Sequence, residues 1–339
     1  SLRLVADIFR FVADEEMSFN PISISGYHMR EAGATAVQEV AFTLANALQY
    51  VRVAVSTGLS IDSFGPRLSF FFASHNNLFE EAAKFRAARR LWARAVRDRF
   101  AANDATARMR FHTQTGGVTL QAQQPLNNVV RVTLQGLAAV LGGTQSLHTN
   151  GYDEALALPT SESATLALRT QQILGYESGV ADVVDPLAGS YYVESLTDSI
   201  EAGARHLMAE VDGLGGAARA IELGFFQEAI ARSAYELQRA QESGDSVVVG
   251  VNRYTDDSPP LSIESPDFSA LETEQCARLA ETKRSRDGGA VNSALQSVRE
   301  AAAGTTPLVP PIIDAVRARS TLGEISDTLR DVWGVYRPA

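Results

Sequence analysis

The strongest constraint on the fold is a unit that occurs four times in the first half of the chain. Each unit is a short apolar segment followed by a long stretch whose apolar residues recur at helical spacing. The apolar segments are ISISGY, RLSFFFAS, ARMRFHTQT and TQSLHTN, at residues 22–27, 67–74, 107–115 and 144–150. This alternation predicts an α/β fold in which helices cover a parallel sheet. With right-handed crossovers, the four units form either half of a (β/α)8 barrel or a short doubly wound sheet.

The second half of the sequence is more polar and almost wholly helical. We predict helices over 192–243, 270–303 and 309–335, with a break at 212–216, a short strand at 246–254 and a polar loop at 255–269. The predicted domains are therefore residues 1–175, with the four strand–helix units, and residues 176–339, a mainly helical segment. The basic run KFRAARRLWARAVRDR, residues 84–99, is predicted to be an exposed or partner-facing side of its helix.

Four units alone would leave two open sheet edges. The first residues, SLRLVADIFRFVADEE, have the pattern of an amphipathic helix without a capping residue, and the sequence does not start with Met. We therefore expect the chain to be the C-terminal part of something longer. We also expect it to fold poorly as an isolated monomer, because a half-barrel leaves apolar strand faces exposed.

Composition narrows the classes of function. Of the 339 residues, 45% are hydrophobic and 21% are charged, so the chain is globular rather than disordered. No stretch of about 18 apolar residues predicts a membrane span. The net charge of −10 argues against a nucleic-acid partner. The single cysteine, Cys276, excludes an internal disulfide and fits the cytoplasm.

Four of the five histidines occur one per unit, within or just after a predicted strand: His28, His75, His112 and His148. The carboxyl ends of parallel strands meet at one edge, where the active sites of such folds lie. The histidines could ligate a metal in a barrel hydrolase. However, no His-x-His pair or strand-end carboxylate accompanies them, and Gln, Asn and Thr surround them in FHTQTGG and GGTQSLHTN. This favours a hydrogen-bonding site for a polar organic ligand and leaves the metal hydrolase as the alternative.

Other candidate residues flank the predicted strands. Arg67, at the start of the second strand, suits a phosphate or carboxylate clamp, or is a solvated charge. Gly116 and Gly117 allow a ligand or another element to approach the backbone closely. A spacing of four residues predicts one helical face for Asn150, Glu154 and Leu158.

Long motifs lie in order along nearly the whole chain. They include FNPISISGYHMREAGA, GPRLSFFF, RFHTQTGGVTLQAQQPLNNVVR, LAAVLGGTQSLHTNGYDEALALPT and TLGEISDTLRDVWGVYRP. With these motifs the chain resembles the large, catalytic subunit of adenosylcobalamin-dependent acyl-CoA mutases, the family of methylmalonyl-CoA mutase. The resemblance implies a (β/α)8 TIM barrel with the substrate threaded along its axis, of which this chain supplies the C-terminal half, followed by the mainly helical segment. The first four units would precede Ser1.

The resemblance also implies a cofactor and partners. The cofactor is adenosylcobalamin, and the family ligates its cobalt with the histidine of an Asp-x-His-x-x-Gly motif. That motif does not occur here, so the resemblance places the histidine on a separate domain or subunit and no metal ligand in this chain. It further implies an acyl-CoA substrate, a cobalamin-binding small subunit or domain in a hetero-oligomer, a GTPase chaperone, and no activity without the missing N-terminal half and the cobalamin-binding partner.

The roles of individual residues follow from matching motifs. By resemblance, His28 hydrogen-bonds the thioester carbonyl of the substrate, and Tyr27 flanks it as a second catalytic residue. The substrate-binding positions are His28 again, with Arg67 and Ser69 at the phosphates of coenzyme A and His112 and Gln114 near the acyl and deoxyadenosyl groups. The positions that contact cobalamin or its adenosyl group are Glu31, Gly117, Gln145, Asn150, Glu154, Ala155 and Leu158.

The implied reaction is an isomerisation. Homolysis of the cobalt–carbon bond gives a radical that takes hydrogen from the substrate, the thioester-bearing group migrates to the adjacent carbon, and hydrogen returns. The segments FFASHNNLFEEAAKFRAARR and FHTQTGGVTLQAQQP look more like isobutyryl- and 2-hydroxyisobutyryl-type mutases, and Ser18 stands where the methylmalonyl group usually has lysine. An isobutyryl-type substrate is therefore expected first and methylmalonyl-CoA second. A metal-dependent barrel hydrolase and a non-catalytic fragment are the alternatives.

Overall fold

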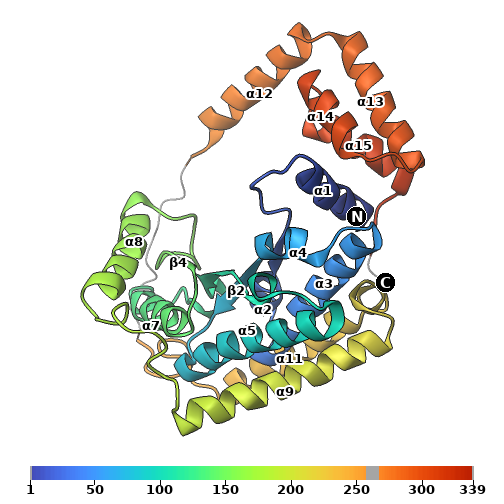
Figure 1. Ribbon diagram of the computed structural model, residues 1–339. Helices are drawn as coiled ribbons and strands as arrows, with labels where there is room; N and C mark the ends of the chain where they lie inside the picture. The colour runs from blue at the N-terminus through green and yellow to red at the C-terminus, as the bar shows by residue number, and fades with distance from the viewer. Residues whose placement is uncertain (1, 257–266, 338–339) are drawn as a thin grey trace. The chain divides into compact units, whose positions relative to one another are not determined.

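Four parallel strands form the sheet of this protein. A computed structural model describes residues 2–256 and 267–337 (Figure 1). The strands follow the order β1-β2-β3-β4, with β1 at Ser23–Ser25, β2 at Ser69–Ser74, β3 at Phe111–Thr115 and β4 at Ser146–His148. Each strand lies inside the segment predicted for it, so the four parallel strand–helix units are confirmed. The sheet is compatible with part of a barrel, and the barrel itself stays a prediction.

Contacts divide the described chain into two compact units. The sheet unit consists of residues from Asn20 to Val55 and from Leu59 to Asp256. The helical unit consists of the described residues up to Phe19, the short segment Ser56–Gly58, and the described residues from Asp267 onward.

Long helices follow the strands and cover one face of the sheet. They are α3 (Ala36–Ser56), α5 (Leu78–Phe100), α7 (Asn127–Leu141) and α8 (Ser161–Tyr176). On the covered face, Phe70 packs edge-on against Trp92 of α5 with ring centroids 4.9 Å apart, and Phe111 stacks on Phe85 of α5 at 5.2 Å. All four rings are buried and form the core between sheet and helices.

The opposite face of the sheet is more polar. The strand register places one row across all four strands, made of Ser25, Phe71, His112 and Ser146. The next row towards the carboxyl ends is Ala73, Gln114 and His148. Because successive side chains in a strand point to opposite faces, the candidate residues of β3 lie away from the core that α5 covers.

Short elements connect the strands and long helices. They are α2 (Tyr27–Glu31), α4 (Ile61–Phe64), the 3-10 turn η1 (Gly65–Arg67), α6 (Asp104–Ala107) and the 3-10 turn η2 (Gly117–Thr119). The third strand therefore begins later than the predicted residue 107. The side chain of Asn103 accepts a hydrogen bond from the Thr106 amide and starts α6 at this point.

Helix α9 (Tyr191–Gly213) covers the basic side of α5 (Figure 1). Arg86 pairs with Glu194 of α9, and Arg90 and Arg94 both pair with Glu201, a buried carboxylate of the same helix. The prediction of an exposed or partner-facing basic surface is thus wrong for Lys84, Arg86 and Arg90, whereas Arg94, Arg97 and Arg99 are exposed as predicted. The partners of the arginines lie 107 to 111 residues further along the chain, beyond the reach of a local pattern.

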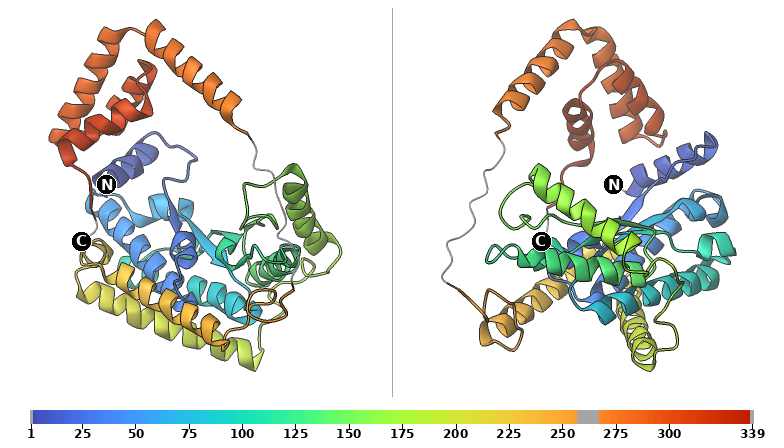
Figure 2. Two further views of the ribbon diagram at one scale, coloured as in Figure 1. Left: turned by 180° about the vertical axis from the view of Figure 1, so that it is seen from behind. Right: turned by 90° about the vertical axis from the view of Figure 1, so that its left-hand side faces the viewer.

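Two further helices belong to the sheet unit. They are α10 (Ala217–Glu222) and α11 (Phe225–Ser243), which carries the chain back past α3 (Figure 2). Phe226 of α11 stacks on Phe42 of α3 with centroids 4.1 Å apart. The hydroxyl of Ser233 donates to the Gly33 carbonyl at 2.8 Å. Helix α11 therefore reaches the loop that follows α2, the helix that carries Tyr27, His28 and Glu31.

The helical unit contains α1 (Leu2–Asp14), α12 (Ser269–Ser285), α13 (Gly288–Ala303), α14 (Val309–Arg317) and α15 (Leu322–Trp333). Arg3 of α1 donates to the Ala302 carbonyl at 2.9 Å, and Leu308 is fully buried among apolar side chains of this unit. The two helical stretches predicted at 270–303 and 309–335 each contain two helices. Asp287 caps α13, and Thr321 forms a capping box with Glu324 at the start of α15.

The strand predicted at 246–254 is wrong. This segment forms a turn with one isolated bridge between Val249 and Arg253, and Gly250 has φ +81°. The Asn252 side chain accepts from the Val248 amide and donates to the Ser246 carbonyl, both at 2.8 Å. These local side-chain bonds offer the backbone an alternative to strand pairing. Of the loop predicted at 255–269, residues 257–266 lie outside the described residues.

The domain boundary predicted at residue 175 stays a prediction. Helices on either side of it, α5 and α9, pack together within the sheet unit. Among the described residues, no helix is long and apolar enough to cross a membrane.

Candidate functional site

The carboxyl ends of the four strands bring together segments that are far apart in the sequence. Helix α2 follows β1 after Gly26, and His75 follows β2 directly. Gly116 and Gly117 follow β3, and Asn150 comes two residues after β4. We call this edge of the sheet the carboxyl rim. It is the edge at which parallel α/β folds place ligands.

Two predicted site residues meet at the carbonyl of Thr115, the last residue of β3, and a third bonds one of them. The Tyr27 hydroxyl donates to this carbonyl at 3.4 Å, and the Asn150 amide donates to it at 3.0 Å. The Gln114 amide donates to Asn150 Oδ1 at 2.9 Å. The Tyr27 ring also stacks on Phe71 with centroids 4.9 Å apart. Burial, then the Glu31 charge, raise the pKa of Tyr27 to about 12, so its phenol stays a neutral donor.

His28, the predicted catalytic histidine, is exposed on α2 next to Tyr27. Its Nδ1 lies 3.4 Å from the hydroxyl of Ser25, which belongs to the polar face of the sheet. Burial lowers the pKa of His28 below its usual value, so the ring is neutral at pH 7. A neutral imidazole in this place offers one donor nitrogen and one acceptor nitrogen.

His112 and His148 lie within strands β3 and β4, whereas His28 and His75 follow their strands. His112 is the second residue of β3, with Nδ1 2.7 Å from the Ser146 hydroxyl and its ring 5.1 Å from that of Phe71. Burial, and then neighbouring His148, lower the pKa of His112. His75 differs from all of these, since its side chain is turned into the protein and only 14% exposed. The four histidines therefore do not converge on one point as their even spacing suggested.

Gly117 stands between three of the predicted cofactor residues. A Cβ at this position would lie 3.1 Å from Glu31 Oε2, 3.2 Å from Asn150 Nδ2 and 3.6 Å from Glu154 Cγ. These residues come from the segments that follow β1, β3 and β4, so the sheet brings them together. Glu31 Oε2 also accepts the Val118 amide at 2.8 Å. We call this group of four residues the Gly117 cradle.

The carboxyls of the Gly117 cradle are partly withdrawn from water. Burial is the largest cause that raises the pKa of Glu31, and the nearby Glu154 raises it further. Burial also raises the pKa of Glu154, against the attraction of His148. Each carboxyl thus holds a proton more readily than a solvated glutamate does.

Ala155 and Leu158 are exposed beyond the cradle, and Leu158 is 60% exposed. The helical face predicted for Asn150, Glu154 and Leu158 is wrong. Residues 151–159 form turns closed by the Asp153 carbonyl, and α8 begins only at Ser161, where Thr160 caps it. A cap at Thr160 starts the helix too late for the three residues to share it.

Three predicted residues lie at the opposite, amino edge of the sheet. Arg67 ends η1 and donates to the Ser63 carbonyl at 2.7 Å, and Ser69 begins β2. Gln145 precedes β4, accepts the Phe111 amide at 2.6 Å and donates to the Gly143 carbonyl at 2.7 Å. The resemblance placed Gln145 and Asn150 together among the cofactor contacts. The structure separates the two residues. Strand β4 runs between them, so they lie at opposite ends of it.

Sequence reasoning missed a buried charge network beneath the carboxyl rim. Lys84 donates to Glu39 at 2.6 Å and to the Ala73 carbonyl at 2.7 Å, and it also bonds Glu81. Arg30 of α2 donates to Glu81 at 2.9 Å. Burial would raise the pKa of Glu81, but Lys84 and Arg30 outweigh it and hold that pKa at about 2. Arg30 thus anchors α2, the helix that carries Tyr27, His28 and Glu31. The sequence did contain a signal of this network, because Glu39 in EVAF and Glu81 and Lys84 in EAAKF are charged residues at core-facing positions of their helices.

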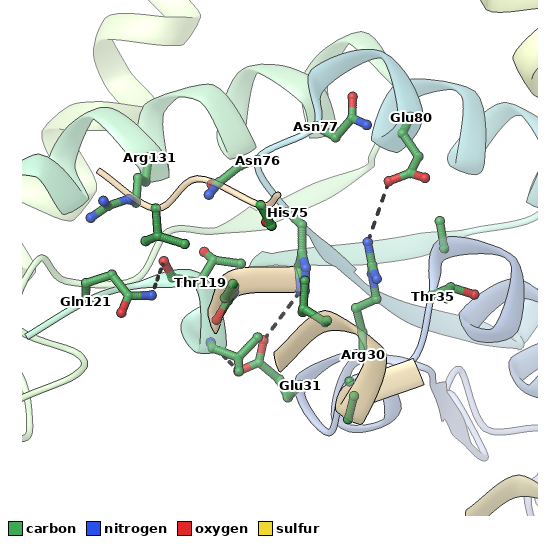
Figure 3. A pocket seen from close by; sticks show the side chains of 18 of the residues that line it. Arg30, Glu31, Thr35, His75, Asn76, Asn77, Glu80, Thr119, Gln121 and Arg131 are labelled. Atoms are coloured by element: carbon green, nitrogen blue, oxygen red, sulfur yellow. Dashed lines mark hydrogen bonds and ion pairs between the residues drawn. The ribbon is translucent and has the colours of Figure 1, made fainter. Parts of the chain in front are cut away.

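A pocket of about 1060 Å³ opens beside the rim (Figure 3). Its wall includes Arg30, Glu31 and His75, and it extends between α7, α11 and the turn at 246–249. In Figure 3, His75 and Glu31 point towards one another across this wall. Within residues 2–256 and 267–337, no three His, Cys, Asp or Glu side chains gather in a way that could hold a metal ion.

Comparison with known families decides the class of the chain. The sequence model of the family described as methylmalonyl-CoA mutase matches residues 1–335. The chain belongs to the methylmalonyl-CoA mutase family. This confirms the resemblance inferred from the sequence motifs.

Individual members of the methylmalonyl-CoA mutase family are similar over almost all of the chain. A methylmalonyl-CoA mutase of Rhizobium meliloti (strain 1021) is 49% identical over 338 residues, which are 99% of this chain and 48% of the relative. The 2-hydroxyisobutanoyl-CoA mutase large subunit of Aquincola tertiaricarbonis is 47% identical over 340 residues, 99% of this chain and 60% of the relative. The methylmalonyl-CoA mutase of Escherichia coli (strain K12) is 46% identical over 337 residues, 99% of this chain and 47% of the relative. The chain thus spans about half the length of the curated relatives it matches.

Proposed function

We propose that this chain is part of the catalytic subunit of an adenosylcobalamin-dependent acyl-CoA mutase, an isomerase that rearranges the carbon skeleton of a short branched acyl-CoA. The observation that carries the proposal is the Gly117 cradle at the carboxyl rim, next to the neutral donors of Tyr27 and Gln114. A site of neutral donors suits a reaction in which the cofactor performs the difficult step and the protein orients the substrate.

The Gly117 cradle fits a large cofactor with many hydrogen-bonding groups. Glu31 Oε1 is a buried acceptor without a hydrogen-bond partner among the described residues. The absence of a side chain at Gly117 leaves the backbone open between three polar side chains. Adenosylcobalamin, when bound, supplies a carbon radical by homolysis of its cobalt–carbon bond. We assign Glu31, Asn150 and Glu154 to hydrogen bonds with it, Gly117 to its close approach, and the exposed Ala155 and Leu158 to apolar contact.

His28 is assigned to the thioester carbonyl of the substrate. Nδ1 lies 3.4 Å from the Ser25 hydroxyl, and we assign the hydroxyl as the donor, which places the single ring proton on Nε2. A neutral Nε2–H donor stabilises the negative charge that grows on the carbonyl oxygen during rearrangement. Tyr27 closes one side of this place and excludes water, because its ring is held flat against Phe71.

Coenzyme A is assigned to the polar face of the sheet, with Arg67 and Ser69 at its phosphates. Six residues of β2 separate the amino edge from the carboxyl rim, a length of about 17 Å at ~3.3 Å for each of five steps. The extended arm of coenzyme A can span such a length. His112 and Gln114 lie between the two ends on the same face, where they can contact the acyl portion.

The remaining architecture follows from the open edges of the sheet. Strands β1 and β4 each have a neighbour on only one side among the described residues. We infer that the sheet is half of a (β/α)8 barrel and that four further units complete it. The name of the Aquincola tertiaricarbonis relative, a large subunit, supports a hetero-oligomer with a small subunit. That partner would carry the histidine that ligates cobalt.

The substrate is proposed to be an isobutyryl-type acyl-CoA first and methylmalonyl-CoA second. Overall identity does not separate the two, because relatives of both kinds match at 47% and 49%. The test is a mutase assay of the full-length subunit with a cobalamin-binding small subunit and adenosylcobalamin. Isobutyryl-, 2-hydroxyisobutyryl- and methylmalonyl-CoA are offered in parallel, with His28→Ala as the control. Turnover of one substrate that is lost in the variant supports the proposal. Failure to turn over any of them, although the small subunit binds, refutes it.

A further inference from the structure

We propose that His75 is a positioning residue that holds the carboxylate of Glu31 in the orientation required for its contact with the cofactor. The inference rests on the proposed function, because it concerns a residue of the Gly117 cradle. His75 is not among the residues that the sequence motifs assigned to the site. It lies opposite Glu31, and both residues line the neighbouring pocket (Figure 3).

The first observation is a pair of buried polar atoms that face each other. His75 Nε2 and Glu31 Oε1 are both buried and have no hydrogen-bond partner among the described residues. They lie 3.9 Å apart, which is about 1 Å longer than a normal hydrogen bond. An unpaired buried donor or acceptor carries a free-energy penalty, so a small movement that closes this gap is favoured.

The second observation is the charge of the imidazole. Burial, and then the Arg30 charge, lower the pKa of His75 to about 3, with Lys84 acting in the same direction and Glu81 against it. The ring is therefore neutral at physiological pH and carries one N–H donor. A neutral donor orients the Glu31 carboxylate without cancelling its charge, which remains free to act on the cofactor.

The third observation is the space made for the ring. A Cβ at Gly116 would lie 2.4 Å from His75 Cδ2 and 2.8 Å from Nε2. Gly116 has φ −73°, a conformation open to any residue, so its backbone does not require glycine. The imidazole does require it, because even an alanine would displace the ring from Glu31.

The two ends of the contact are held in different ways. The other carboxylate oxygen of Glu31 accepts the Val118 amide at 2.8 Å, and this bond holds one side of the group in place. His75 follows a strand whose Ala73 amide and carbonyl are bonded by Glu39 and Lys84. The imidazole is thus the rigid partner, and the carboxylate of Glu31 is the group whose rotation it determines.

The test compares binding of adenosylcobalamin, followed by its absorbance, in the full-length protein with its cobalamin-binding partner. His75→Phe removes Nε2 and keeps a flat ring, whereas His75→Gln restores an N–H near the same place. We expect the Kd to rise about five- to tenfold in H75F and to stay within about twofold in H75Q. In a Glu31→Gln background, H75F should add no further loss. An unchanged Kd in H75F, or an equal loss in both backgrounds, would overturn the proposal.

A second measurement needs no cofactor. Long-range proton–nitrogen NMR of the histidine rings reports which nitrogen of His75 carries the proton. We expect Nε2 to be protonated between about pH 6 and 8, and its signal to shift in E31Q but not in the neighbouring control Glu80→Gln. A ring protonated on Nδ1 alone would overturn the role of His75 and leave the proposed function untouched. A wild-type protein that does not bind adenosylcobalamin would overturn the proposed function as well.

Discussion

Replacing Lys84 with methionine tests whether the carboxyl rim rests on a balanced set of buried charges. Lys84 is fully buried and bonds Glu39, Glu81 and the Ala73 carbonyl. Methionine has a similar length, so the variant keeps most of the packing and loses three charge-assisted hydrogen bonds. With Arg30, the group has two positive and two negative charges, and the variant leaves it with a net charge of −1.

Removing one partner of a buried ion pair costs about 3–5 kcal/mol, because an uncompensated charge stays in the interior. We therefore expect K84M to lower the free energy of unfolding by about 3–5 kcal/mol. Lys283 of α12 is exposed, and Lys283→Met should change that free energy by less than about 0.5 kcal/mol. Adding Glu39→Gln to K84M restores a net charge of zero and should recover part of the loss.

The loss in K84M should also depend on pH. Burial raises the pKa of Glu39 despite the attraction of Lys84, and removal of Lys84 raises it further. A carboxyl with a higher pKa in the folded than in the unfolded state binds more protons when folded. Its stabilising effect is present at low pH and is lost as pH rises through the folded pKa. K84M should therefore lose less stability at about pH 5 than at about pH 8.

The assay is urea unfolding of the full-length subunit, followed by far-ultraviolet circular dichroism and compared between the variants. A loss below about 1 kcal/mol in K84M, or an equal loss at both pH values without recovery in the double variant, would refute the reasoning.

Three further predictions follow from the site and its supports. Because the pKa of Tyr27 is raised to about 12, ultraviolet titration should show a tyrosine that ionises only near pH 12, and this late step should be lost in Tyr27→Phe. Gly116→Ala should destabilise the fold by about 1–3 kcal/mol through its clash with the His75 ring, measured by thermal unfolding. Gly175→Ala, in α8 with no neighbour within 4 Å, is the control and should not destabilise. Glu201→Gln should lower stability by about 1–3 kcal/mol at pH 7, because it removes the buried charge that pairs with three arginines. Since those arginines lower its pKa against the effect of burial, this difference should shrink as pH falls through the folded pKa, and a difference independent of pH would contradict the assignment.

Several features of the fold were predictable because their signals are local. Helix and strand periods involve residues within one or two turns. The caps at Thr160 and Thr321 are equally local but were not predicted, and the late start of α8 at the Thr160 cap is why the helical face expected at 150–158 was wrong. The motifs at residues 19–34 and 110–131 were specific enough to predict the family, which the comparisons confirmed. The turn at 246–254 escaped prediction because its apolar pattern matched a strand, while Asn252 and Gly250 formed a competing turn.

The composition of the site was also predictable in part. Motif matching named Glu31, Gly117 and Asn150 one by one, but it could not show that they surround one backbone position. It named Gln145 as their neighbour, although that side chain bonds the backbone at the other end of β4. It did not find His75 as a partner of Glu31, because the two residues are 44 positions apart and follow different strands.

Short-range physics therefore determined the elements of this protein: the sequence contains the periods, caps and glycines that produce four parallel strand–helix units. Long-range packing determined the site. The register of four parallel strands aligns their carboxyl ends, so segments after β1, β3 and β4 meet at Gly117. The burial of Lys84 with two glutamates and the covering of the α5 arginines by α9 likewise depend on contacts between helices distant in sequence. Such contacts form only when apolar faces are buried together, and no local window of the sequence contains both partners.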